Sequence, residues 1–133
     1  MVYQSSHILM LMLLVATLGC SNASSEAAAK QAMSREMNKW IAGEDSGAET
    51  MVHDIRGEAP PVGFEIKSIV KTEPDWRAHS QEEEPKNLKE FPAYLVNVDI
   101  EFKSQAGTPL HNVATYTMTW NPDEEKWYIQ EEF

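Results

Sequence analysis

Residues 94–103 alternate between apolar and polar side chains more regularly than any other part of the chain. The apolar set is Tyr94, Val96, Val98, Ile100 and Phe102, and the residues between them are Leu95, Asn97, Asp99, Glu101 and Lys103. Successive side chains of a β-strand point to opposite faces of a sheet, so this pattern predicts a strand with one apolar face. Such a strand needs a second layer to cover that face.

Two more strands are predicted after it. In residues 112–121 we expect Ala114, Tyr116, Met118 and Trp120 to face inward, and Val113 with Thr115, Thr117 and Thr119 to lie on an exposed face that β-branched residues suit. In residues 127–133 we expect Trp127, Ile129 and Phe133 to face inward. Residues 105–109 and 121–125 make the turns. Connections this short predict an antiparallel meander.

A helix is predicted over residues 26–42. Ser25 is suited to cap its first turn, and Gly43 stands where a helix commonly ends. The apolar residues Ala29, Met33, Met37, Trp40 and Ile41 recur at spacings of three and four, which places them on one face. We expect that face to cover the sheet, and we interpret its methionines and tryptophan as core rather than as a ligand wall.

Between the helix and the meander the pattern is less regular. A short helix is predicted over residues 48–55, with Ser46 as cap and Met51, Val52 and Ile55 inward. Residues 57–63 form a connector, because consecutive prolines exclude helical and ladder hydrogen bonds. Residues 64–72 predict a further strand, whose alternation fails at Ile69–Val70 and indicates either a bulge or burial on both faces.

Residues 73–91 are rich in charge and proline, and we predict a long excursion between strands there. Trp76 is expected to fix this segment to the body of the domain, and residues 82–84, three consecutive glutamates, to be solvated. Loops of this length within a compact domain are often functional.

The N-terminus has a different character. Residues 8–15 are an unbroken apolar run, too short to cross a bilayer and typical of a signal peptide. The run leads into Ala16-Thr17-Leu18-Gly19-Cys20, which resembles the lipobox of bacterial lipoproteins. Thr17 stands where that family usually has leucine, and residues 1–7 have no lysine or arginine. An ordinary secreted chain with a chance cysteine is the alternative.

The lipoprotein resemblance implies cleavage between Gly19 and Cys20 and acylation of Cys20, with residues 20–25 as a short tether. Two or more acyl chains give stable membrane anchoring. Ser21 after the cysteine resembles lipoproteins that are sent to the outer membrane. The implied location is therefore the bacterial cell envelope, anchored by lipid in the outer membrane and facing the periplasm.

Length and charge restrict the remaining possibilities. Removing 19 of the 133 residues leaves 114, which is one domain over residues 26–133 after the tether. Its net charge of −10 argues against nucleic-acid binding, and it predicts that lipid rather than the protein surface holds the domain at the membrane. Cys20 is the only cysteine, so no intrachain disulfide is expected.

The expected fold class is α+β, with an N-terminal helix packed on a curved antiparallel sheet of about four strands. This order of elements resembles the cystatin-like roll of the nuclear transport factor 2-like superfamily. Residues 40–44 (WIAGE) resemble that family's common helix end, and residues 123–129 (DEEKWYI) resemble its closing hairpin. Some members are enzymes that work in the cone between helix and sheet with an Asp or His base and a Tyr donor.

The resemblance makes a ligand pocket of Tyr94, Tyr116, Trp40 and Trp120 the candidate site. No base accompanies them, because Asp99 falls on the outward face and His53 and His79 lie near a helix end and in the excursion. His53, His79 and His111 lack metal-ligand spacing. Residues 123–125 have too few ligands for calcium and are interpreted as a solvated turn. No cofactor, metal or catalytic residue is predicted.

Two function classes remain open. The first is a non-catalytic interaction module of the envelope, which contacts a protein through residues 73–90 of the excursion. The second is a small-molecule binder or enzyme that uses the cone. A cone filled by Trp40, Trp120 and Met118 favours the first class. Two copies are also expected to be able to pair through Val113, Thr115, Thr117 and Thr119.

Overall fold

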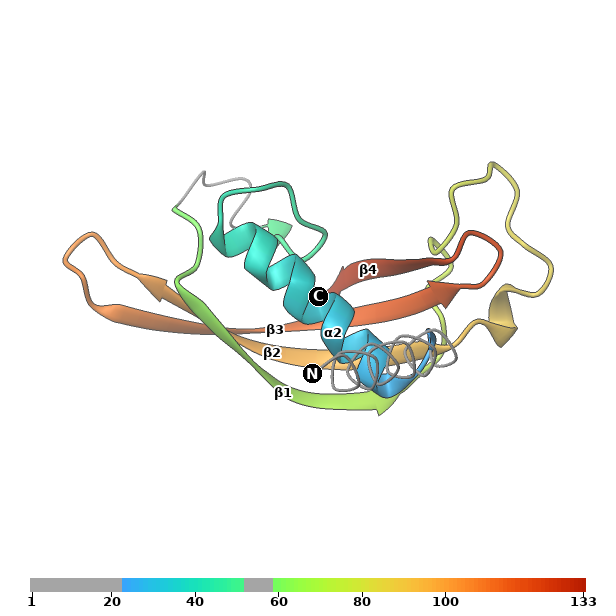
Figure 1. Cartoon of the computed structure of the whole chain (residues 1–133), viewed down its shortest axis with the longest axis horizontal. Helices are drawn as coiled ribbons and strands as arrows, with labels where there is room; N and C mark the ends of the chain where they lie inside the picture. Colours follow the sequence, from blue (N-terminus) through green and yellow to red (C-terminus); the bar gives the residue numbers. More distant parts are fainter. Residues whose placement is uncertain (1–22, 52–58) are drawn as a thin grey trace, which may run out of the picture.

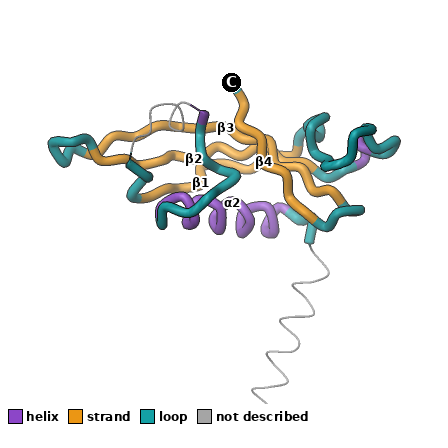
Figure 2. Tube along the Cα trace, turned by 90° about the horizontal axis from the view of Figure 1, so that it is seen from above, coloured by secondary structure: helices purple, strands orange, loops and turns teal. Residues whose placement is uncertain are grey.

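The computed structural model describes residues 23–51 and 59–133. The predicted signal peptide, the Gly19–Cys20 cleavage site, the predicted acylation site Cys20 and residues 21–22 of the tether lie outside these residues, as does His53. Helix α2 (Glu26–Ile41) lies across one side of an antiparallel sheet (Figure 1, Figure 2). The strands are β1 (Gly63–Lys71), β2 (Ala93–Lys103), β3 (Pro109–Asn121) and β4 (Lys126–Glu132), in the order β1-β2-β3-β4. The predicted α+β arrangement is therefore confirmed.

Helix α2 begins and ends as its sequence predicts. The Ser25 hydroxyl accepts a hydrogen bond from the Ala28 amide at 3.1 Å, which satisfies one of the free amides of the first turn. At the other end Gly43 adopts φ = 78°, a conformation that costs glycine little. The helix buries one face against the sheet, through Ala29, Ala32, Met33, Met37 and Trp40. Ile41, also expected there, is half-buried.

The sheet contributes the other half of the core. Strand pairing places Tyr94 opposite Met118 and Val96 opposite Tyr116, so alternate residues of β2 and β3 share the side that α2 covers. The buried members from these strands are Tyr94, Val96, Val98, Ile100, Ala114, Tyr116 and Met118, with Phe64, Ile66, Ile69, Phe102, Trp127 and Ile129 packed around them. The period of two in residues 94–103 thus predicted this face correctly.

Two expectations before the meander were correct only in part or wrong. Of the two interpretations of β1, the bulge is confirmed, but the register shift lies between Ile66 and Ser68 and not at Ile69–Val70. Because one residue is inserted there, Ile69 returns to the helix-covered side and Val70 stays 54% exposed. In the predicted second helix, residues 48–50 form no helix, and Met51 is 54% exposed instead of inward. Residues 52–55 lie outside the described part.

The opposite side of the sheet is partly covered by the excursion of residues 73–91, seen in yellow at the right end of the sheet (Figure 1). A second small core forms there from Ala78, Leu88 and Phe91, with Tyr128 of β4 packed against it. Leu88 belongs to a short 3₁₀ helix, η1 (Leu88–Glu90). The excursion is therefore a folded flap on the β3–β4 end of the sheet.

Three expectations about the exposure of side chains are wrong. Trp76 does not fix the excursion to the body, since it is 69% exposed while Ala78 is fully buried. Thr117 and Thr119 do point away from α2, but both are buried, and the Thr119 hydroxyl accepts a hydrogen bond from the Asp75 amide. Phe133 follows the end of β4 and is 87% exposed instead of inward.

Candidate functional site

Two of the four predicted pocket residues, Tyr116 and Trp40, are buried in the core, and a third, Tyr94, is a buried core residue that also borders a surface hollow. Tyr116 is fully buried and its hydroxyl donates to the Ala48 carbonyl oxygen at 2.6 Å. Burial raises the pKa of this phenol well above its usual value, so Tyr116 stays neutral. Trp40 is buried at the C-terminal end of α2 and meets Phe102 edge to face, with ring centroids 5.8 Å apart.

The other two border separate surface hollows. Tyr94 lines one beside Thr72 and Pro92, and its hydroxyl donates to the Ser24 carbonyl oxygen at 3.0 Å. Trp120 lines another between α2 and the β3–β4 turn, where its ring lies 5.4 Å from that of Trp127. The structure thus distributes the four residues over the core and two hollows. Trp40 and Met118 fill the space between helix and sheet as expected, whereas Trp120 is only half-buried.

The carboxylate of Glu124, in the turn between β3 and β4, accepts four hydrogen bonds. Its oxygens accept hydrogen bonds from the Ser80 amide and hydroxyl, the Asn121 side-chain amide and the Tyr128 hydroxyl, at 3.1, 2.6, 2.8 and 2.7 Å. The bonds from Ser80 and Tyr128 lower the pKa of Glu124. This carboxylate therefore joins the excursion to the β3–β4 hairpin.

Sequence reasoning missed this role of Glu124 and interpreted residues 123–125 only as a solvated turn. The local signal was Asn121, whose side-chain oxygen accepts hydrogen bonds from the amides of Asp123 and Glu124, as asparagine commonly does in turns. Nothing local indicated Ser80, which is 44 residues away in the sequence.

Hydrogen bonds hold the backbone of the excursion before and after Trp76. The Asp75 amide before it donates to the Thr119 hydroxyl, and the Ala78 carbonyl after it accepts from the Asn121 side chain. Asp75 also pairs with Arg77 through two side-chain bonds of 2.9 and 2.8 Å, which lower the carboxyl pKa and raise that of the guanidinium. The chain is thus held on both sides of an indole that stays in solvent.

Two other exposed apolar side chains, Met51 and Phe133, share a surface hollow with Arg77, the neighbour of Trp76 in the sequence. The Arg77 guanidinium carbon is 5.9 Å from the Trp76 ring centroid. The hollow lies at the C-terminal end of β4. Among the described residues β4 pairs only with β3, so β4 is an edge strand of the sheet. We call Met51, Trp76, Arg77 and Phe133 the Trp76 corner.

The two histidines in the described part of the chain lie in separate polar contacts. His111 lies 3.1 Å from an Asp99 oxygen and 3.6 Å from a Glu101 oxygen, on the side of the sheet away from α2, as expected for Asp99. The ring of His79 contacts the Gln81 carbonyl oxygen at 2.8 Å. Within residues 23–51 and 59–133 no group of His, Cys, Asp or Glu is arranged to hold a metal ion.

Comparison with known proteins gives no family. No family model, no curated protein and no solved structure matches the chain. Among the helices of the described residues, none has the length and apolar character needed to cross a bilayer.

Proposed function

We propose that this chain is a lipid-anchored, non-catalytic binding module of the bacterial cell envelope, and that the Trp76 corner contacts a protein partner. The anchoring half rests on the sequence that ends at Gly19–Cys20. The envelope location, the outer-membrane assignment and membership of a nuclear transport factor 2-like superfamily belong to the same proposal. The helix-on-sheet arrangement supports the last of these.

The exposed indole of Trp76 is the single observation that carries the binding half. Tryptophan and arginine are enriched among the residues that dominate protein interfaces, and Trp76 and Arg77 are adjacent here. Hydrogen bonds at Asp75 and Ala78 already hold the backbone on both sides of Trp76. Little conformational entropy of this segment is therefore lost when a partner covers the indole. Met51 and Phe133, which share a hollow with Arg77, are further exposed apolar side chains.

The side chains of Tyr116 and Trp40 from the predicted pocket support the proposal that the module is non-catalytic, because they are engaged in the core. The Tyr116 hydroxyl is occupied by a core hydrogen bond, and Trp40 and Met118 are buried. A small-molecule site or an enzyme in the cone remains the alternative proposal, and it would need these side chains to move. Pairing of two copies through the threonine face is restricted to Val113 and Thr115, because Thr117 and Thr119 are buried.

Acylation is tested by the intact mass of the full-length protein purified from bacterial membranes. We expect the mass of a chain beginning at Cys20 plus its acyl groups, and loss of both cleavage and membrane association in Cys20→Ala. A wild-type chain that retains residues 1–19, or one that leaves the membrane without detergent, would overturn the anchoring proposal.

The contact surface is tested by placing a photoreactive phenylalanine analogue at position 76 in living cells. Position 110 is the matched control, because Leu110 is also exposed, at 52%, and lies at the far end of β3. We expect a discrete crosslinked protein from position 76 that position 110 does not give, and that Arg77→Ala weakens. Equal adducts from both positions, or none from position 76, would contradict this half of the proposal.

A further inference from the structure

The charge of the domain is unevenly distributed. Helix α2 has three cations, Lys30, Arg35 and Lys39, against two carboxylates, Glu26 and Glu36, and therefore a net charge of +1. Since the whole chain carries −10, the residues outside α2 carry −11. Strand β1, with Lys67 and Lys71 against Glu65, has the same net charge, but α2 has the largest number of cations among the described helices and strands.

The three cations gather on the side of α2 that faces away from the sheet. They line a shallow hollow with the neutral side chains of Gln31, Ser34 and Asn38. Lys39 lies 3.5 Å from Glu36, whereas no described residue forms an ion pair with Lys30 or Arg35. The one carboxylate of the hollow, Glu44, lies beyond the C-terminal end of the helix. We call this surface the α2 polar face.

The position of the anchor brings this face to the membrane. Only five residues separate Cys20 from Glu26, and a fully extended chain between these two residues reaches about 20 Å at most. A helix of 16 residues is about 24 Å long. The N-terminal part of α2, with Lys30 and Arg35, is therefore held within reach of the headgroups whenever Cys20 is in the bilayer.

From these observations we infer that the α2 polar face rests on the anionic bilayer surface in which Cys20 is anchored. This inference depends on the proposed acylation of Cys20, and it goes beyond it by fixing which side of the domain faces the lipid. Basic side chains next to a membrane are attracted by anionic lipid, and the −11 of the remaining residues is repelled. Attraction and repulsion therefore favour the same orientation.

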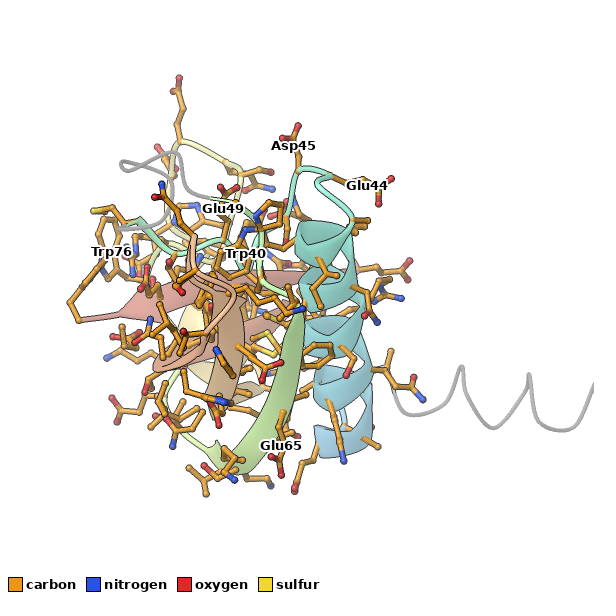
Figure 3. All side chains as sticks on the ribbon, turned by 90° about the vertical axis from the view of Figure 1, so that its left-hand side faces the viewer. Trp40, Glu44, Asp45, Glu49, Glu65 and Trp76 are labelled. Carbon is orange, nitrogen blue, oxygen red and sulfur yellow. The ribbon has the colours of Figure 1, made fainter. Side chains whose placement is uncertain are left out.

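The orientation has a consequence for the Trp76 corner. Figure 3 shows Trp76 on the opposite side of the molecule from α2. With the α2 polar face on lipid, the indole points away from the bilayer, where a protein partner can reach it. Glu44 and Asp45 lie near the C-terminal end of the helix, which is the end farther from the anchor.

Lysine acetylation rates test this inference without added labels. The acylated full-length protein is reconstituted in phosphatidylcholine vesicles with and without phosphatidylglycerol, and its lysines are acetylated with an N-hydroxysuccinimide ester and quantified by mass spectrometry. Lys30 and Lys39 report on the α2 polar face, and Lys86 in the excursion is the internal reference. Arg35→Glu is compared with Lys103→Glu, which makes the same change in net charge at the end of β2.

We expect phosphatidylglycerol to slow acetylation of Lys30 and Lys39 several-fold relative to Lys86. Arg35→Glu should abolish this protection and Lys103→Glu should retain it. Raising the salt concentration from 0.1 to 1 M, which shortens the screening length from about 10 to about 3 Å, should remove it. An acylated protein without lipid-dependent protection, or one in which both variants behave alike, overturns this inference and leaves the anchoring proposal standing. An intact mass without acyl groups overturns both.

Discussion

The hydroxyl of Tyr116 in β3 donates a 2.6 Å hydrogen bond to the carbonyl oxygen of Ala48, and both residues are fully buried. This bond fixes the segment after α2 to the middle of the sheet. Tyr116→Phe keeps the ring but leaves a buried acceptor without its donor, which costs about 1–3 kcal/mol. Urea denaturation should show that loss. Tyr94→Phe is the control, and the interpretation fails if it destabilises the protein as much.

The same tyrosine predicts a dependence of stability on alkaline pH. Burial raises the pKa of the Tyr116 hydroxyl well above the ordinary tyrosine value of about 10, so the unfolded chain loses this proton before the folded protein does. The neutral hydroxyl of Tyr116 contributes fully to the free energy of unfolding below about pH 10, and this contribution is lost as the pH rises toward the pKa of Tyr116 in the folded protein. In urea titrations above pH 10, wild type should therefore lose stability more steeply than Tyr116→Phe. Parallel curves would contradict this.

Glu124 predicts the opposite dependence in acid. Hydrogen bonds from Ser80 and Tyr128 lower the pKa of Glu124 in the folded protein below its ordinary value of about 4.5. The ionised carboxylate therefore stabilises the fold above about pH 4.5, and this stabilisation is lost as the pH falls through the pKa of the folded protein. Glu124→Gln should speed hydrogen exchange at the Ser80 amide at neutral pH and weaken its response to acid. Glu125→Gln, a change in the same turn at an exposed residue, should leave Ser80 unchanged.

Trp76 and Phe91 should separate binding from folding within the excursion. Trp76→Ala removes a side chain that is 69% exposed, so the free energy of unfolding should change by less than about 0.5 kcal/mol while partner crosslinking at the Trp76 corner is lost. Phe91→Ala empties the second small core and should cost about 3 kcal/mol or more. A comparable loss of stability in both variants would show that Trp76 supports the fold.

The cap of α2 offers a test at the start of the domain. Ser25→Ala removes the acceptor for the Ala28 amide and should cost about 1 kcal/mol, whereas Ser25→Gly should cost only a few tenths. Thermal unfolding of the two variants measures the difference. Equal midpoints would mean that the hydroxyl bond contributes nothing measurable.

The local patterns predicted the elements well. Ser25 and Gly43 marked both ends of α2, and the alternation from Tyr94 to Phe102 gave the helix-covered side of β2, because both signals depend on residues near one another in the chain. Trp76, Thr119 and Phe133 were placed wrongly. Their burial depends on whether the excursion folds back over the sheet, and alternation along a single strand carries no information about that.

What the sequence determined by itself is helix α2, the four strands, their antiparallel order and the side of β2 and β3 that α2 covers, since these follow from periodicity and short connections. It also supplied the whole basis for the proposed anchor at Cys20. Only the tertiary structure decided that Glu124 joins Ser80 to the β3–β4 hairpin, that Trp76 stays in solvent while Tyr116 is enclosed, and that Lys30, Arg35 and Lys39 share one surface. The contacts of Glu124 and Tyr116 join residues 44 and 68 positions apart, and such distant pairs meet only when the whole chain has packed.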